Sequence, residues 1–375
     1  MKIAVKAWLT IFCGLVALQS FGQTTWLRTA APTNSWRLIA CSADGNQLIA
    51  SADVAKTVWI STNSGATWRL THLPSKFWTS FALSADGTKI VAAASHPATS
   101  GGIYVSRDSG ATWTITDLPD LCWSSVAISG DGSKLIAVAV RGDTPGAVYT
   151  SADFGWTWTQ CKNIDASAFW DSVVLSVDGS KAILVSADHM YRSMDGGSTW
   201  SLLATPPPIS GGASPACLLA SSQDGSTLFF ADHSPTGGLI YRSTDFGMTW
   251  TATAAPKASW TFIASSDEGK TVMVLPSAYQ SGPLYVSTDS GQSWTTNSPT
   301  QVWCDVACSA DGRRLFASSQ GTTIMSRDGA IYVLGPANRP VNDESISARL
   351  FILTNWQYHV MPATPANRFY RLRTP

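Results

Sequence analysis

The sequence predicts an all-β protein of seven similar units, each made of four short strands, and two recurring motifs support this prediction. The first motif is an octet, Ser-x-Asp-x-Gly-x-Thr/Ser-Trp, which is complete at Ser106–Trp113, Ser151–Trp158, Ser193–Trp200, Ser243–Trp250 and Ser287–Trp294. Ser61–Trp68 is the same octet with asparagine at the aspartate position, and a seventh copy that begins at Ser326 lacks the tryptophan. The mean period of about 44 residues is typical of a four-stranded propeller blade.

The second motif lies upstream of each octet and consists of a tryptophan, five residues, and then a serine that opens an Asp-Gly turn. The tryptophans are Trp36, Trp78, Trp123, Trp170, Trp260 and Trp303, and the fifth unit has Ala216 instead. Apolar runs flank each turn, which predicts a β-hairpin with a primed turn and positive φ at both central residues. A third strand, such as Ile103–Val105, and a fourth strand after the octet complete the unit. Together the motifs predict a seven-bladed β-propeller of four-stranded blades.

The N-terminal strand is expected to close the ring. Thr24-Thr25-Trp26 matches the end of an octet, and the spacing from Trp26 to Trp36 repeats the spacing from Trp68 to Trp78. We therefore expect this segment to be the outermost strand of the seventh blade, because closure removes open sheet edges. Ile331–Leu334 competes for the same place but lacks the tryptophan. The expected organisation is a signal peptide at 1–22, the propeller at 23–330 and a short C-terminal β tail at 331–375.

The N-terminus predicts export. Lys2 and Lys6 precede an apolar stretch over 7–21, about 15 residues and so shorter than the roughly 20 needed to span a bilayer. Small residues at Ser20 and Gly22 predict cleavage before Gln23, and a lipid anchor at Cys13 is the alternative. We expect a secreted or periplasmic protein with no membrane span.

Composition argues against several classes of partner and cofactor. The 25 Lys and Arg balance 25 Asp and Glu, and only 13% of residues are charged, so no basic patch for nucleic acid is expected. No Cys-x-x-Cys pair exists, and no cofactor or metal site is assigned. Asp188-His189 and Asp232-His233 suggest a metal site, but duplication of one blade explains them equally well. Cys41 and Cys308 share one repeat position in the first and seventh blades, so either a disulfide or two buried thiols fit.

Candidate ligand-binding residues surround the expected channel mouth, where the second tryptophan motif begins. The octet residues are expected to hold their own turns, so none is assigned a catalytic role. The repeat tryptophans either pack between blades or form an aromatic platform for sugar rings or a peptide. Residues beside them vary from blade to blade, as expected where partner choice is encoded. The candidate set is Trp36, Trp78, Trp123, Trp170, Trp260, Trp303, Arg37, Asp171 and Asp305.

The octet resembles the Asp-box, or BNR, repeat of sialidases, sortilin-type receptors, two-propeller xyloglucanases and photosystem II stability and assembly factors. The resemblance covers about residues 24–330 and implies a β-propeller whose Asp-boxes lie away from the ligand face. The assembly factors look closest in size. Sialidases of this superfamily carry a Phe-Arg-Ile-Pro sequence and a Tyr–Glu pair, whereas this chain lacks the former and has two glutamates, Glu268 and Glu344.

These observations predict a non-catalytic scaffold that binds an unknown protein or glycan at the channel mouth and acts as a monomer. The alternative is a glycoside hydrolase of the sialidase-like or xyloglucanase-like type. Two non-repeat carboxylates that face each other across the channel mouth would favour the enzyme, because two carboxylates suffice for glycoside hydrolysis.

Overall fold

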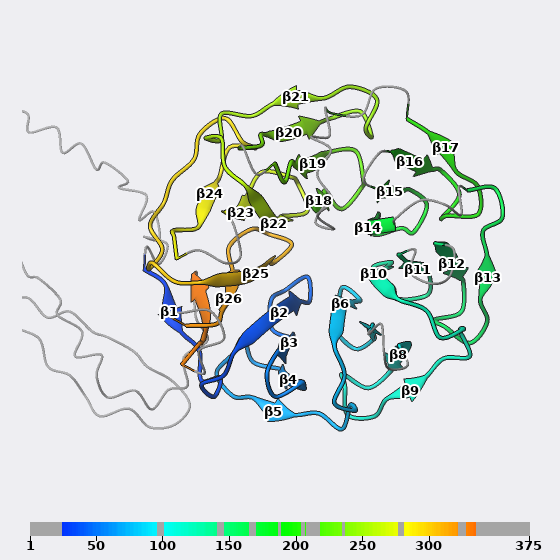
Figure 1. Cartoon of the computed structure of the whole chain (residues 1–375), viewed down its shortest axis with the longest axis horizontal. Helices are drawn as coiled ribbons and strands as arrows, with labels where there is room; N and C mark the ends of the chain where they lie inside the picture. Colours follow the sequence, from blue (N-terminus) through cyan, green and yellow to red (C-terminus); the bar gives the residue numbers. More distant parts are fainter. Residues whose placement is uncertain are drawn as a thin grey trace, which may run out of the picture. The chain divides into compact units, whose positions relative to one another are not determined.

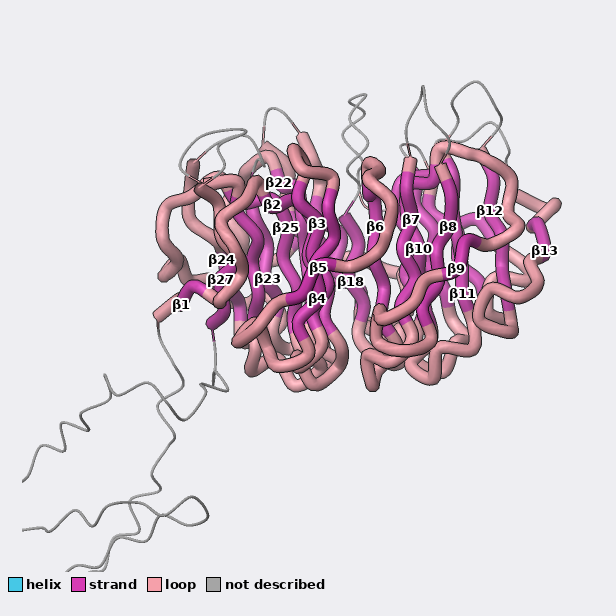
Figure 2. The backbone as a smooth tube through the Cα atoms, turned by 90° about the horizontal axis from the view of Figure 1, so that it is seen from below, coloured by secondary structure: helices cyan, strands magenta, loops and turns pink. Residues whose placement is uncertain are grey.

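The computed structural model describes residues 25–95, 101–140, 146–164, 170–186, 189–203, 207, 218–234, 237–276, 281–321 and 328–334. Within these ranges the chain forms seven antiparallel sheets arranged as blades around a central axis (Figure 1). The strands of each blade run between two faces, as the side view shows (Figure 2). The prediction of a seven-bladed, all-β propeller is confirmed.

The first four blades each contain four strands in chain order from the axis outward. Blade one is β2 (Trp36–Cys41), β3 (Leu48–Ala52), β4 (Thr57–Ser61) and β5 (Arg69–Leu70). Blade two is β6 (Trp78–Leu83), β7 (Ile90–Ala94), β8 (Gly102–Ser106) and β9 (Thr114–Ile115). Blade three is β10 (Trp123–Ile128), β11 (Leu135–Ala139), β12 (Ala147–Ser151) and β13 (Thr159–Gln160). Blade four is β14 (Trp170–Leu175), β15 (Ala182–Ser186), β16 (Met190–Ser193) and β17 (Ser201–Leu202).

The fifth and sixth blades follow the same order. Blade five is β18 (Leu218–Ser221), β19 (Leu228–Ala231), β20 (Ile240–Ser243) and β21 (Thr251–Ala252). Blade six is β22 (Trp260–Ser265), β23 (Val272–Pro276) and β24 (Tyr285–Ser287). In the part of blade six that the structure describes, the outer strand is reduced to a bridge between Val286 and Thr295.

The seventh blade joins the two ends of the repeat array. It consists of β25 (Trp303–Cys308), β26 (Leu315–Ser319), β27 (Ile331–Leu334) and the N-terminal β1 (Leu27–Arg28). Leu27 pairs with Val333 and Arg28 with Tyr332, so the N-terminal segment is the outermost strand, as predicted. Ile331–Leu334 does not compete for that place, because it is the third strand and pairs on its other side with β26.

The blade therefore extends to Leu334, four residues beyond the boundary expected at 330. The reason is that the aromatic residue of a third strand packs on the repeat tryptophan of its own blade, and Tyr332 does so in β27. Tyr332 packs edge-on against Trp303 with ring centroids 5.2 Å apart, and Tyr104, Tyr149, Tyr191 and Tyr285 contact the repeat tryptophans of their own blades at 5.4–5.7 Å. The expected signal peptide at 1–22 and the rest of the C-terminal tail lie outside the described residues.

The hairpins between the two inner strands have a different turn from the one predicted. At Ser42-Ala43-Asp44-Gly45 the glycine N–H donates to the Ser42 carbonyl, and only Gly45 has positive φ, at 67°. The hydroxyl of Ser42 and the N–H of Asn46 both donate to Asp44 Oδ1, so the aspartate side chain holds a longer loop. The prediction of a primed turn was wrong, because Asx-type hydrogen bonding by the aspartate replaces positive φ at that residue.

The octets form turns that their own side chains hold, as expected. In blade three, Ser151 Oγ accepts the N–H of Gly155 at 2.8 Å and donates to Asp153 Oδ1. Asp153 in turn accepts the N–H and the hydroxyl of Thr157. These hydrogen bonds to the carboxylate lower the pKa of Asp153 to about 2. The octet is therefore a local structural device and needs no ligand to explain its composition.

Candidate functional site

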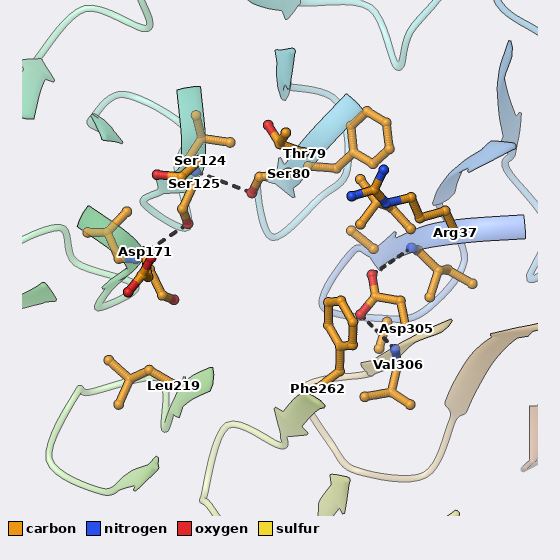
Figure 3. Close-up of a pocket in the computed structure, with 18 of the residues that line it drawn as sticks. Arg37, Thr79, Ser80, Ser124, Ser125, Asp171, Leu219, Phe262, Asp305 and Val306 are labelled. Atoms are coloured by element: carbon orange, nitrogen blue, oxygen red, sulfur yellow. Dashed lines mark hydrogen bonds between the residues drawn. The ribbon is translucent and has the colours of Figure 1, made fainter. Parts of the chain in front are cut away.

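The inner strands line a chamber of about 580 Å³ on the propeller axis (Figure 3). Hydroxyl side chains form part of its wall, at Thr79, Ser80, Ser124, Ser125 and Ser172. Apolar side chains form another part, at Leu38, Phe81, Leu219 and Phe262. The charged residues of the lining are Arg37, Asp171 and Asp305. The chamber thus offers polar, apolar and charged surface at one place.

A bulge at the start of the inner strands determines which side chains reach the chamber. The pairing between the two inner strands shifts register directly after the repeat tryptophan, as between Trp36 and Leu38, in all blades except the fifth among the described residues. A bulge adds one unpaired residue and breaks the alternation of side chains between the two faces. As a result, residues at both the second and the third position of the motif line the chamber.

Backbone hydrogen bonds form a ring around the channel below the chamber. The N–H of one residue in each Asp-Gly turn donates to the carbonyl of the equivalent residue in the next blade, at 2.7–3.0 Å. This amide ring runs through Ala43, Ala85, Gly130, Val177, Gln223, Asp267 and Ala310, and the last donates back to the first. The same residues line a narrower space of about 190 Å³. The chamber therefore widens towards the face from which the inner strands start.

Hydroxyl groups of the wall tie neighbouring blades together. Ser80 Oγ accepts the N–H of Val126 at 3.2 Å, and Ser125 Oγ accepts the N–H of Val173 at 3.4 Å. One position earlier in the motif, Thr79 donates to the Trp123 carbonyl at 2.9 Å and Ser124 to the Trp170 carbonyl at 2.6 Å. The wall is held in place from blade to blade by these contacts.

Asp305 takes the place of these serines at the junction of blades seven and one. Its Oδ2 accepts the N–H of Ile39 at 2.9 Å, and its Oδ1 accepts the N–H of Val306 at 2.8 Å. The preceding blade has Phe262 at the equivalent position, which offers no acceptor to Val306. Burial among the inner strands raises the pKa of Asp305 to about 7, although the two N–H donors and Arg37 favour the charged form.

Arg37 and Asp171 complete the charged lining. Arg37 Nη1 lies 3.4 Å from Asp53 Oδ1, with 43% of the arginine side chain exposed. Asp171 lies on β14 of the fourth blade, across the chamber from Asp305 on β25 (Figure 3). The structure thus brings together the three charged residues of the predicted candidate set.

The six repeat tryptophans do not form an aromatic platform. Trp36, Trp78, Trp123, Trp170, Trp260 and Trp303 are only 0–2% exposed and pack between neighbouring blades. Trp123, for example, belongs to one buried cluster with Val91, Ile103 and Val105 of blade two and with residues of its own blade. The packing alternative explains their recurrence, because these indoles fill the space between sheets. Their ring faces are covered by protein and are not available to a ligand.

Sulfur and imidazole groups give no metal centre in the described part of the chain. No cluster of three or more His, Cys, Asp or Glu residues there is arranged to hold a metal ion. The Cys41 thiol donates to the carbonyl of Cys308 at 3.2 Å, and both cysteines are free. His233 Nδ1 lies 2.6 Å from the Trp260 carbonyl, and Asp188 lies outside the described residues. These contacts are structural.

The blade geometry agrees with a family model. The model for the BNR/Asp-box repeat matches residues 241–252, which include the whole octet of blade five. The chain carries the BNR/Asp-box repeat. The same contacts of serine, aspartate and glycine recur in the other complete octets. These octets are therefore copies of the same repeat.

Solved structures show a similar fold. The GH74 xyloglucanase from Xanthomonas campestris has a TM-score of 0.60 at 15% identity, and the alignment covers 82% of this chain and 55% of that one. YCF48 from Cyanidioschyzon merolae has a TM-score of 0.59 at 15% identity, with 84% and 100% covered. YCF48 bound to D1 peptide has a TM-score of 0.57 at 14% identity, with 83% and 96% covered.

This chain thus spans about half the length of the xyloglucanase and the full length of YCF48 from Cyanidioschyzon merolae. At these identities the likeness is one of fold. A search of curated protein sequences finds no match. In the described residues, no helix combines the length and apolar character needed to cross a bilayer.

Sequence reasoning missed the uncharged part of the chamber wall. Ser80, Ser125 and Ser172 share the third position of the tryptophan motif with Asp305, and this repeat position was the available signal. Strict alternation along the strand would place the third position on the same side as the buried tryptophan. The bulge adds a residue between the two positions, and the third position therefore faces the chamber.

Proposed function

We propose that this Asp-box propeller is a non-catalytic scaffold that binds a segment of another protein in the chamber at the channel mouth. The observation that carries the proposal is the chamber itself. It combines a mixed polar and apolar wall with a closed amide ring beneath it, the arrangement expected of a preformed binding site. The fold and length shared with YCF48, a protein solved in complex with D1 peptide, support a peptide ligand over a glycan.

The N-terminal sequence supports a matching location. We propose that residues 1–22 direct export and are removed before Gln23, which leaves a secreted or periplasmic monomer. Mass determination of the protein recovered from the producing cell tests the cleavage site. An intact Met1 or a lipidated cysteine would contradict it.

Peptide display on residues 23–375 tests the binding proposal. Selected peptides should bind the Ser172→Trp variant at least tenfold more weakly, because the indole occupies the chamber. Ala111→Trp is the matched control, since Ala111 is exposed on an Asp-box turn where blade three has Trp156 at the equivalent octet position. Selected peptides whose binding is unchanged by Ser172→Trp would contradict the proposed site, and a selection without binders would contradict a peptide ligand.

A glycoside hydrolase is the second candidate, and the two aspartates favour it. Asp171 and Asp305 are non-repeat carboxylates on opposite walls of one chamber, and a pKa near 7 suits a general acid. Against this role, both oxygens of Asp305 already accept backbone N–H groups. Release of reducing sugar from xyloglucan or other β-glucans by the wild type, abolished in Asp171→Asn, would establish the enzyme.

A further inference from the structure

The charged lining of the chamber is acidic in balance. Asp171 and Asp305 contribute carboxylates, and Arg37 contributes the cation. The guanidinium of Arg37 is paired with Asp53, which does not line the chamber. Arg37 also favours the charged form of Asp305, so the lining holds two carboxylates against one guanidinium that it shares with Asp53.

The carboxylates stand on opposite walls, in the fourth and seventh blades of the ring, and the close-up shows open space between them (Figure 3). Asp305 is fixed in orientation, because its two oxygens accept the N–H groups of Ile39 and Val306. A cationic group placed between the walls would be attracted by both carboxylates in a partly desolvated site, where charge interactions are stronger than in water.

The rest of the wall suits the aliphatic part of a long cationic side chain. Phe81, Leu219 and Phe262 supply apolar surface for an aliphatic stem, and lysine and arginine bury such stems while the charged end stays in a polar place.

We propose that the chamber selects a protein segment bearing a lysine or arginine and holds its charged end between Asp171 and Asp305. This inference rests on the proposed peptide-binding function and specifies its ligand. The apolar wall orders the stem, and the paired carboxylates reject acidic segments by like-charge repulsion.

Two octapeptide libraries test the inference on residues 23–375, one with lysine fixed at the centre and one with Nε-acetyl-lysine there. Acetylation removes the charge and keeps the stem, so the comparison isolates the cation. We expect the lysine library to bind at least tenfold more tightly. Asp171→Asn and Asp305→Ser should each reduce that preference at least fivefold, whereas Asp117→Asn, an exposed aspartate outside the chamber, should leave it unchanged.

The outcomes separate the inference from the function on which it rests. Equal binding of both libraries would overturn the cation proposal and leave peptide binding intact. A lysine preference that survives in both chamber variants would also overturn it, because the cation would then be held elsewhere. Binding of neither library would count against both. Melting curves of each variant confirm that a lost preference is not lost folding.

Discussion

The carboxylate of Asp305 accepts the backbone N–H of Ile39 at 2.9 Å, across the junction where the seventh blade meets the first. Two other blade-seven side chains reach the same neighbour. Ser318 Oγ donates to the Arg37 carbonyl at 3.1 Å, and Arg314 donates to the Asp44 carbonyl at 2.9 Å. The junction that closes the ring is therefore held by side chains along its full height, in addition to the β1–β27 strand pair.

Stability should depend on pH through Asp305. Its pKa is about 7 in the folded protein, above the usual value of 3.8, so the folded state holds its proton more tightly than the unfolded state. The free energy of unfolding should consequently fall as pH rises from about 4 to about 7, by on the order of 2–4 kcal/mol. Urea unfolding at pH 5 and pH 8 measures this difference.

Asp305→Ser should remove most of that dependence. Serine occupies the same repeat position at Ser80 and Ser125, where it accepts a neighbouring N–H without charge. Asp117→Asn, at an exposed site, serves as the control and should keep the wild-type dependence. An unchanged pH response in Asp305→Ser would show that Asp305 titrates normally in the folded protein.

The amide ring should be visible by hydrogen exchange. The amides of Ala43 and Ala310 lie in turns, yet each donates to a carbonyl of the next blade. They should exchange at least about 100-fold more slowly than the adjacent turn amides of Asp44 and Asp311, because release requires the blades to separate. Fast exchange at Ala310 with protection at Ala85 would indicate that the ring is open between blades seven and one.

The repeat tryptophans should stabilise the fold by packing between blades. Trp123 is fully buried between blades two and three, so Trp123→Ala should lower the free energy of unfolding by about 3–5 kcal/mol. Trp156 is 71% exposed and contacts the Arg107 guanidinium at 4.2 Å, so Trp156→Ala should cost less than about 1 kcal/mol. Chemical denaturation of the two variants makes the comparison, and similar losses would contradict the assignment of the indoles to blade packing.

The buried serine of the Asp-box should stabilise its turn. Removing the Ser151 hydroxyl leaves the N–H of Gly155 without its acceptor in a buried turn, so Ser151→Ala should destabilise by about 1–3 kcal/mol. Ser198→Ala removes an exposed hydroxyl from the octet of blade four and should change stability by less than about 0.5 kcal/mol. Equal urea midpoints for Ser151→Ala and Ser198→Ala would contradict the assignment of the octet serine to holding its turn.

The fold was predictable because each repeated residue makes contacts within its own turn or blade, and its side-chain type is the one that these contacts require. Ser151, Asp153 and Gly155 make a self-contained turn, and their recurrence counts the blades. The end of the array was less predictable. Ile331–Leu334 resembles the third strand Ile103–Val105 more than an outer strand. The octet before it has no tryptophan, however, and the contact between Trp303 and Tyr332 joins residues that are far apart in the repeat pattern.

The site was predictable only in part. Arg37, Asp171 and Asp305 are charged at positions where most other blades have uncharged residues, and this difference could be recognised in the sequence. Ser80, Ser125 and Ser172 were not visible as a set, because the bulge after each tryptophan changes which positions reach the axis. The pKa of Asp305 is raised because the residue is buried where the seventh blade meets the first. The spacing of residues in the sequence does not reveal this burial.

Hydrogen exchange of residues 23–375 with and without a display-selected peptide tests the central claim most directly. The account predicts slower exchange in the chamber wall, at 79–81, 124–126, 171–173 and 305–307, with no change in the Asp-box turns. Protection confined to the Asp-box turns or the outer strands would contradict it, because the ligand would then bind away from the channel mouth.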